Sequence, residues 1–184
     1  AAQAKYLRFT VLGTLGPQPC LDELEVFDRD GRNVAVDARP SASGVYRAGL
    51  NPRHTVAHIN DGLYGNEYSW ISDERGGGWV QLEFAEAVEV ERVVWSRDRS
   101  PMPKYSDRLA TKYEVAVSLD GSQWTPVASH RDRIPPGGEA PAAEAFAGLS
   151  PNERAEMESL LAVVADLDKR LKALKEPAKA YIGV

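Results

Sequence analysis

Short runs of alternating polar and apolar residues, separated by glycine-containing turns, fill most of the first 130 residues of this chain. The segments KYLRFTVL, WVQLEF, VEVERVVW and YEVAVSL each have the period of two that is typical of a half-buried β-strand. DRDGRN, RGGGW and SLDGSQW predict turns, because glycine adopts positive φ without strain. A short acidic turn is expected between WVQLEF and VEVERVVW. The pattern predicts an all-β fold, either a β-sandwich or a jelly roll.

The texture of the sequence changes at Ile134, which suggests a sandwich followed by an appendage. After this point the chain is rich in Pro, Gly and Ala and then becomes periodic, as expected for a connector that leads into a helix. The predicted parts are a sandwich, a connector, an amphipathic helix and a tail that leads to a missing domain, over residues 1–133, 134–149, 150–176 and 177–184.

The predicted helix carries its own start and stop signals. Ser150 is placed as the N-cap, Pro151 stands at the first helical position, and Pro177 ends the helix. Its large apolar residues alternate spacings of three and four: Met157, Leu160, Val164, Leu167, Leu171 and Leu174. One helix cannot bury such a stripe alone. We expect the stripe to dock on the sandwich, to pack on a segment outside this chain, or to form a homodimer.

Composition excludes several classes of function. The net charge of −5, with both signs mixed along the chain, provides no basic stripe for nucleic acid. No apolar run is long enough for membrane insertion, and the first ten residues lack the apolar segment of a signal peptide. The single cysteine, Cys20, excludes an internal disulfide and is expected to be buried. No familiar catalytic motif is present, so we do not expect an enzyme.

The order of three segments carries a family resemblance. HINDGLYGNEYSW, then GGWVQLEFAEAVEVERVVW, then KYEVAVSLDGSQWTPVAS resembles the discoidin family, also called factor V/VIII C-type domains, whose relatives include family 32 carbohydrate-binding modules. The closing signature of that family, here AKYLRFTVLGTLGPQPCLDELEVF, stands at the beginning instead. The resemblance therefore implies a circularly permuted discoidin-like jelly roll, of the galactose-binding-like type. Neighbouring surface termini make such a permutation physically easy.

The resemblance also implies a structural calcium ion. In calcium-binding members of the family, an aspartate of the Asp-Gly loop and a glutamate of the closing strand hold the ion; these correspond to Asp61 and Glu23. All-oxygen ligation by a flexible loop suits Ca²⁺. The remaining oxygens would come from His58, Leu63, Asn66 and the carbonyl of Asp22. Because the loop is longer than in many relatives, Tyr68 and Ser69 are alternatives to Asn66, and a metal-free turn is the alternative to the whole site.

Family 32 modules bind sugars with loops at one end of the sandwich, through aromatic faces and planar polar groups. The resemblance implies sugar contacts by Tyr64, Glu67, Tyr68, Arg75, Arg97, Asp98, Arg99, Asp107 and Arg108. The alternative is that the charged residues among them pair with one another and order their loop. The expected function is a calcium-stabilised module that binds an oligosaccharide or polysaccharide. A structural domain that docks neighbouring domains of the same polypeptide is the other hypothesis.

A narrower resemblance concerns the surroundings of this domain. WSRDR and DRLATKYEVAVSLDGSQW, with DELEVF placed first and AYIGV last, are similar to the discoidin-type insert of multidomain cytochrome-c-like proteins of planctomycete bacteria. This resemblance implies a fragment of a larger exported protein, periplasmic or extracellular. The haem-attachment motif C-x-x-C-H is absent from the sequence, so redox chemistry is not expected of this fragment.

Overall fold

A computed structural model describes residues 1–133 and, further along the chain, residues 155–156, 159–160, 162–164, 166–167 and 169–171. The chain divides into two compact units, Ala1–Arg133 and Ile134–Val184. The first unit consists of strands and two short 3₁₀ helices, η1 (Val56–Asn60) and η2 (His130–Asp132).

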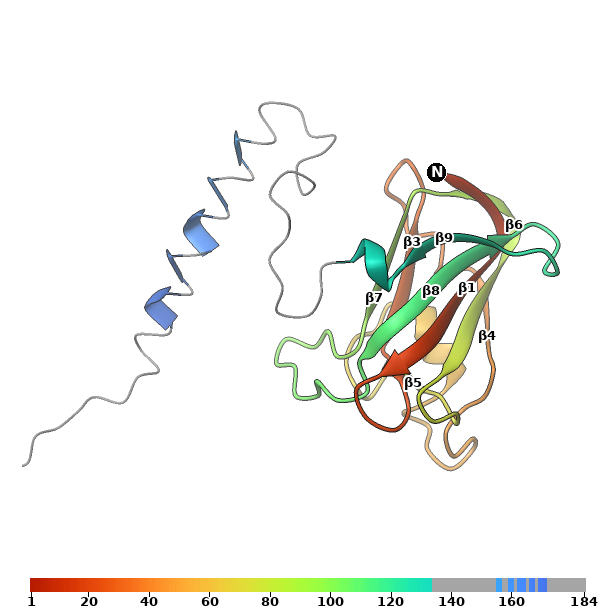
Figure 1. The fold of residues 1–184 in the computed structure, drawn as a ribbon, viewed down its shortest axis with the longest axis horizontal. Helices are drawn as coiled ribbons and strands as arrows, with labels where there is room; N and C mark the ends of the chain where they lie inside the picture. The colour runs from red at the N-terminus through yellow and green to blue at the C-terminus, as the bar shows by residue number, and fades with distance from the viewer. Residues whose placement is uncertain (134–154, 157–158, 161, 165, 168, 172–184) are drawn as a thin grey trace, which may run out of the picture. The chain divides into compact units, whose positions relative to one another are not determined.

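One layer of the first unit is a five-stranded antiparallel sheet (Figure 1). Its strands, in spatial order, are β4 (Arg39–Ala42), β6 (Gly78–Val90), β1 (Ala2–Thr14), β8 (Ala110–Ser118) and β9 (Thr125–Ser129). Although β1 opens the chain, it occupies the centre of this sheet and pairs with β6 on one side and β8 on the other. The first segment of the sequence is therefore needed to assemble the whole layer.

Two short antiparallel pairs complete the sandwich. They are β3 (Glu23–Phe27) with β7 (Arg92–Ser96), and β2 (Cys20–Leu21) with β5 (Trp70–Ile71). The core between the layers takes Leu7 and Phe9 from β1 and Leu24 from β3, all fully buried. Cys20 is buried as expected, and burial raises the pKa of its thiol to about 11. The alternating pattern of the sequence has thus produced an all-β sandwich, as predicted.

The predicted acidic turn between WVQLEF and VEVERVVW is wrong. Strand β6 runs through this segment, because the long strand β1 pairs with both halves of it: Ala4 lies opposite Val88, and Tyr6 lies opposite Glu83. The extra residues of β6 between these pairs form an irregularity in the register, as in a β-bulge. The chain turns at Glu91 instead, where the Glu91 N–H donates to the Phe27 carbonyl (2.9 Å).

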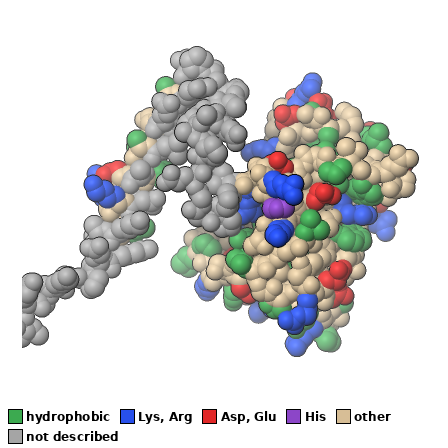
Figure 2. Space-filling view, in the orientation of Figure 1, with side chains coloured by type: hydrophobic (Ala, Val, Ile, Leu, Met, Phe, Trp, Pro, Cys, Tyr) green, Lys and Arg blue, Asp and Glu red, His purple; other side chains and the backbone are tan. Residues whose placement is uncertain are grey.

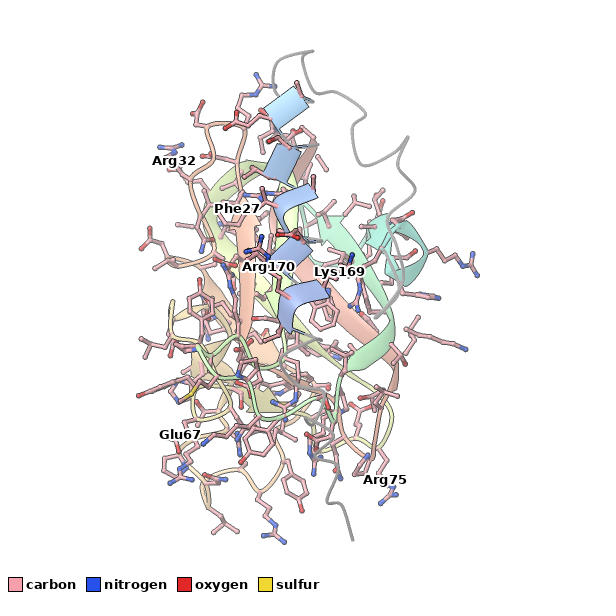
Figure 3. All side chains as sticks on the ribbon, turned by 90° about the vertical axis from the view of Figure 1, so that its left-hand side faces the viewer. Phe27, Arg32, Glu67, Arg75, Lys169 and Arg170 are labelled. Atoms are coloured by element: carbon pink, nitrogen blue, oxygen red, sulfur yellow. The ribbon has the colours of Figure 1, made fainter. Side chains whose placement is uncertain are left out.

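The described residues of the second unit, between 155 and 171, are helical. Arg170, labelled with Lys169 in Figure 3, forms an i, i+4 ion pair with Asp166 (2.8 Å) that supports the helix. On this helix Leu160, Val164, Leu167 and Leu171 are each about half exposed. The predicted helix ends, with Met157 and Leu174, lie outside the described residues, as do the connector and the tail. No helix among the described residues is long and apolar enough to cross a membrane.

Candidate functional site

A groove of about 520 Å³ opens between the loop of residues 46–54 and the loop that leads into β8. Three of the predicted sugar-binding residues line it, together with Asn66 and a set that the sequence analysis did not single out. The complete lining is Tyr46, Arg47, Leu50, Asn51, His54, Asn66, Ile71, Arg97, Tyr105, Asp107 and Arg108. Aromatic, guanidinium, amide and carboxylate groups therefore meet in one hollow.

Two of these residues have unusual backbones. Arg47 (φ 52°) and Arg108 (φ 59°) are the two non-glycine residues with positive φ in the described part of the chain. This conformation costs an ordinary residue roughly 1–2 kcal/mol, and such strain concentrates at binding sites. The Arg108 amide donates to the Leu15 carbonyl, and its carbonyl accepts from the Cys20 N–H (3.0 Å), which holds the strained geometry. Both strained residues line the same groove.

Arg97 forms the buried wall of the groove, with only 5% of its side chain exposed. Its guanidinium donates to the Asn66 Oδ1 (3.1 Å), the Asp107 carbonyl (2.8 Å) and the Asp107 Oδ1 (3.2 Å), and the Tyr105 ring centre lies 5.6 Å away. Asp107 Oδ2 lies 3.4 Å from Arg108 Nε. Of the pairs expected as the alternative to sugar contact, Asp107 with Arg108 is present, whereas Arg97 pairs with Asp107 rather than with Asp98. The same side chains both brace the loop and line the groove.

Three predicted sugar-binding residues, Tyr64, Asp98 and Arg99, do not line the groove and bind other parts of the protein instead. The Tyr64 hydroxyl donates to Glu25 (2.9 Å), whose other oxygen accepts from Arg99 (2.6 Å), and the Arg99 guanidinium lies 4.6 Å from the Tyr64 ring centre. The Asp98 carboxylate accepts the backbone N–H groups of residues 104 and 105. Burial acts to raise the pKa of Asp98, but these hydrogen bonds lower it overall. In this geometry the three residues brace the loops.

Glu67, Tyr68 and Arg75 are exposed and are not among the residues that line the groove. Figure 3 places Glu67 and Arg75 at the same end of the sandwich, opposite Arg32, with their side chains directed outward. Glu67 lies 3.7 Å from Arg53, and the Tyr68 ring packs edge-on against His58.

The groove residues that sequence reasoning missed are concentrated in the loop 46–54, YRAGLNPRH, which precedes the Asp-Gly loop. Its aromatic and basic residues beside glycine and proline were the available signal.

Beside the groove, the predicted calcium residues Asp22 and Glu23 are both fully buried but differ in their partners. The Asp22 carboxylate is satisfied: it accepts the Ser96 hydroxyl and the N–H groups of Gly65 and Arg99, both at 2.7 Å. Glu23 Oε1 accepts the Gly62 N–H (3.2 Å), while its Oε2 has no partner. Burial, followed by the charges of Asp61, Glu25 and Asp22, raises the pKa of Glu23 to about 8.

The Asp-Gly loop closes over Glu23. Asp61 Oδ1 accepts the Leu63 N–H (2.9 Å), and its Oδ2 lies 2.7 Å from His58 Nδ1. Asn66 is turned toward Arg97, and its carbonyl accepts the Ser69 hydroxyl. In the part of the chain that the structure describes, no three His, Cys, Asp or Glu side chains are grouped as a metal site. An ion here would depend on Glu23, Asp61 and backbone carbonyls.

A second hollow, of about 760 Å³, follows β7 and reaches β9. Its wall includes Val93, Trp95, Tyr113 and Val115, and Arg97 lines both this hollow and the groove. A comparison with family models, with curated proteins and with solved structures finds no match for this chain.

Proposed function

We propose that this chain is a non-catalytic carbohydrate-binding module of the discoidin type, which calcium stabilises and which keeps a larger exported protein on polysaccharide. The observation that carries the proposal is the groove that contains Arg47, Arg97 and Arg108, two of them with strained backbones. Strained residues persist where the surrounding structure holds them, and they cluster at active sites and ligand-binding sites.

The groove supplies both kinds of contact that a sugar requires. Tyr46 and Tyr105 offer aromatic surface for the C–H face of a sugar ring, and 47% of Tyr105 is exposed. Asn51, Asn66 and the guanidinium groups can hydrogen-bond neighbouring hydroxyls. The volume of about 520 Å³ falls in the range of small-ligand sites.

Two exposed tyrosines provide a matched test of this site. Tyr105 lines the groove, while Tyr68, with a similar exposure of 41%, does not. We expect Tyr105→Ala to weaken binding roughly tenfold, because a stacked aromatic contributes about 1–1.5 kcal/mol. Tyr68→Ala should bind like the wild type. A glycan array followed by affinity electrophoresis in polysaccharide gels, with calcium present, measures both. Failure of the wild type to bind any glycan would overturn the proposal.

Calcium is proposed on the strength of one atom, the Glu23 Oε2, which is buried without a partner. A cation at this position would be held by Glu23 and Asp61, with carbonyls of the Asp-Gly loop as further ligands. Its charge would favour the ionised form of Glu23, which burial alone opposes. Carboxylate and carbonyl oxygens are the ligands that Ca²⁺ prefers.

The topology supports the permuted discoidin jelly roll that we propose. The AKYLRFTVL signature lies in the central strand β1, and residues 23–27 of DELEVF form β3. In the proposed permutation, the turn that follows β3 joins the former ends of the domain. This turn is short: Phe27 bridges Asn33, and the Gly31 N–H donates to the Asp28 carbonyl (3.0 Å). A tight connection of this kind is what adjacent termini allow.

The hollow along β7 favours the second candidate function, that of a docking domain. Among the described strands, β7 pairs with β3 only, so we propose that an added strand would pair with its other edge. The occupant that we propose is an extended segment from a neighbouring domain of the same polypeptide. Docking would be the better account if the wild type bound no glycan and if the fluorescence of Trp95 changed when neighbouring domains were added.

The helix of the second unit is proposed as a further docking element. Its half-exposed leucines require a partner, which is either the sandwich, another domain or a second copy of the chain. Light scattering and amide hydrogen exchange on the wild type and on a Leu160→Glu, Leu167→Glu double variant measure this. We expect the variant to lose either dimerisation or the amide protection of the helix. A monomeric wild type with freely exchanging helix amides would show that the stripe has no partner here.

A further inference from the structure

The groove is positively charged, although the whole chain is acidic. Three arginines, Arg47, Arg97 and Arg108, and one carboxylate, that of Asp107, line it, which gives a net charge of +2 compared with −5 for the chain. On the face of the sandwich seen in Figure 2, basic and acidic side chains are instead interspersed. A local excess of one sign between low-dielectric walls attracts ligands of the opposite sign.

Asp107 does not neutralise this excess. One carboxylate is shared between two guanidinium groups, with its Oδ1 3.2 Å from Arg97 Nη2 and its Oδ2 3.4 Å from Arg108 Nε. The Asp107 side chain is 56% exposed, so water screens both pairs. The groove therefore retains positive charge after its internal pairs are formed.

Arg47 is the arginine that remains available to a ligand. It forms no ion pair with any described residue, and its guanidinium lies 5.3 Å from the centre of the Tyr46 ring. It is exposed, on a backbone held at φ 52°. Guanidinium groups bind carboxylate and sulfate oxygens with paired hydrogen bonds, which neutral hydroxyls match less well.

We infer that the groove selects acidic saccharides, which carry carboxylate or sulfate groups, over neutral ones, and that Arg47 recognises the acidic group. The inference rests on the proposed function, because it takes the groove to be the sugar site. In this arrangement Tyr46 and Tyr105 contact the sugar ring, while Arg97 and Asp107 keep the loop in shape. Arg47 then favours binding of those sugar rings that carry a carboxylate or sulfate group.

The test is a glycan array printed in pairs that differ only in the charged group: uronate against the parent hexose, and sulfated against unsulfated oligosaccharide. We expect the wild type to bind the acidic member of a pair at least tenfold more tightly, with an affinity that falls as salt rises. Arg47→Gln should remove roughly tenfold more affinity for acidic glycans than for neutral ones, because it removes one charge-assisted contact, whereas the glutamine amide can still hydrogen-bond a neutral hydroxyl. Comparison of the uronate pairs with the sulfated pairs shows which acidic group the groove binds.

Arg32→Gln is the matched control, because Arg32 lies at the opposite end of the sandwich from Glu67 and Arg75 (Figure 3). It removes the same charge from the chain and should bind acidic glycans like the wild type. Equal binding of acidic and neutral partners would overturn the inference but leave the carbohydrate-binding proposal standing. Equal binding of polyglutamate would also overturn it, as an unspecific polyanion effect. Absence of binding to any glycan would overturn both proposals.

Discussion

Two Asp-Gly turns in this sandwich, Asp61-Gly62 and Asp120-Gly121, share a dipeptide and a backbone conformation but differ in what surrounds them. Gly62 and Gly121 have φ values of 76° and 75°. The Asp120 carboxylate is used entirely within its own hairpin: it accepts the N–H groups of Ser122 and Gln123, both at 2.8 Å, and the Ser118 hydroxyl. Those bonds hold the pKa of Asp120 well below its usual range, the Gln123 N–H first.

The Asp61 turn is instead linked to a distant strand. Its Gly62 N–H donates to the buried Glu23, 39 residues away in the sequence, and the Asp61 charge acts on that carboxyl. The Asp120 carboxylate therefore finds all its hydrogen-bond partners within its own hairpin. The Asp61 turn lies against Glu23, whose buried Oε2 has no hydrogen-bond partner. Identical dipeptides thus serve a hairpin in one place and the candidate calcium site in the other.

The largest effect should come from pH, in protein freed of calcium by chelation. The raised pKa of Glu23 means that the folded state favours the protonated acid. Its contribution is fully present below the unfolded pKa of about 4.3 and is lost as pH rises through the folded value of about 8. Unfolding by urea between pH 4 and 9 should show stability falling by up to roughly 5 kcal/mol from this group.

Glu23→Gln should remove that decline, because the amide is neutral at every pH. The Asp120 turn responds in the opposite sense: its lowered pKa gives stability that is present above the unfolded pKa and lost as pH falls through the folded one. A wild type whose stability is as flat above pH 4 as that of Glu23→Gln would show that Glu23 ionises without cost, and the difference between the two turns would disappear.

Calcium should produce the second-largest effect. At a concentration one hundred times its dissociation constant, an ion that binds only the folded state stabilises it by about 2.7 kcal/mol. This stabilisation should raise the melting temperature of both the wild type and Asp120→Ala, because the Asp120 carboxylate bonds only within its own hairpin. Asp61→Ala and Glu23→Ala should not respond. If chelation leaves the melting curve of the wild type unchanged, the Asp61 loop is only a turn.

The fold was largely predictable from the sequence, because alternation and turn residues act locally. The strands KYLRFTVL and YEVAVSL and the hairpin at Asp120 follow from patterns a few residues long. The continuous strand β6 did not, since its acidic segment is extended only because β1 is long enough to pair beyond it. That pairing joins two strands about 80 residues apart in the sequence, so a pattern a few residues long cannot predict it.

The candidate site was less predictable for the same reason. The link between Glu23 and the Asp61 loop came from the family resemblance, and the bond from Gly62 to Glu23 places the two side by side. The groove also includes Arg47, whose positive φ and place in the same lining as Arg97 cannot be predicted from the segment YRAGLNPRH. Tyr64 and Arg99 were predicted to contact sugar, but neither lines the groove, and both bind the carboxylate of Glu25 in β3.

Asp120→Ala should have a moderate effect that calcium does not change. It leaves the N–H groups of Ser122 and Gln123 without their acceptor and exposes them to water, so the loss is that of a cap rather than of a buried charge. We expect the melting temperature to fall by a few degrees, equally with calcium and with chelator, in parallel calorimetric scans. A larger loss with calcium present would show that this hairpin also contributes to the ion site.

The smallest effect separates the two turns by charge alone, in calcium-free protein. Asp61→Asn and Asp120→Asn each remove one negative charge and keep an oxygen that accepts the backbone N–H of its turn. Asp61 also loses its pair with His58, which is partly exposed and contributes under about 1 kcal/mol. Because the charge of Asp61 raises the pKa of Glu23, Asp61→Asn should make the decline in stability end at a lower pH and be smaller, since the unfolded pKa at which it begins is unchanged. Asp120→Asn should leave that decline where the wild type has it. Urea unfolding across the same pH series measures both, and coincident curves for the two variants would show that Asp61 and Glu23 do not interact.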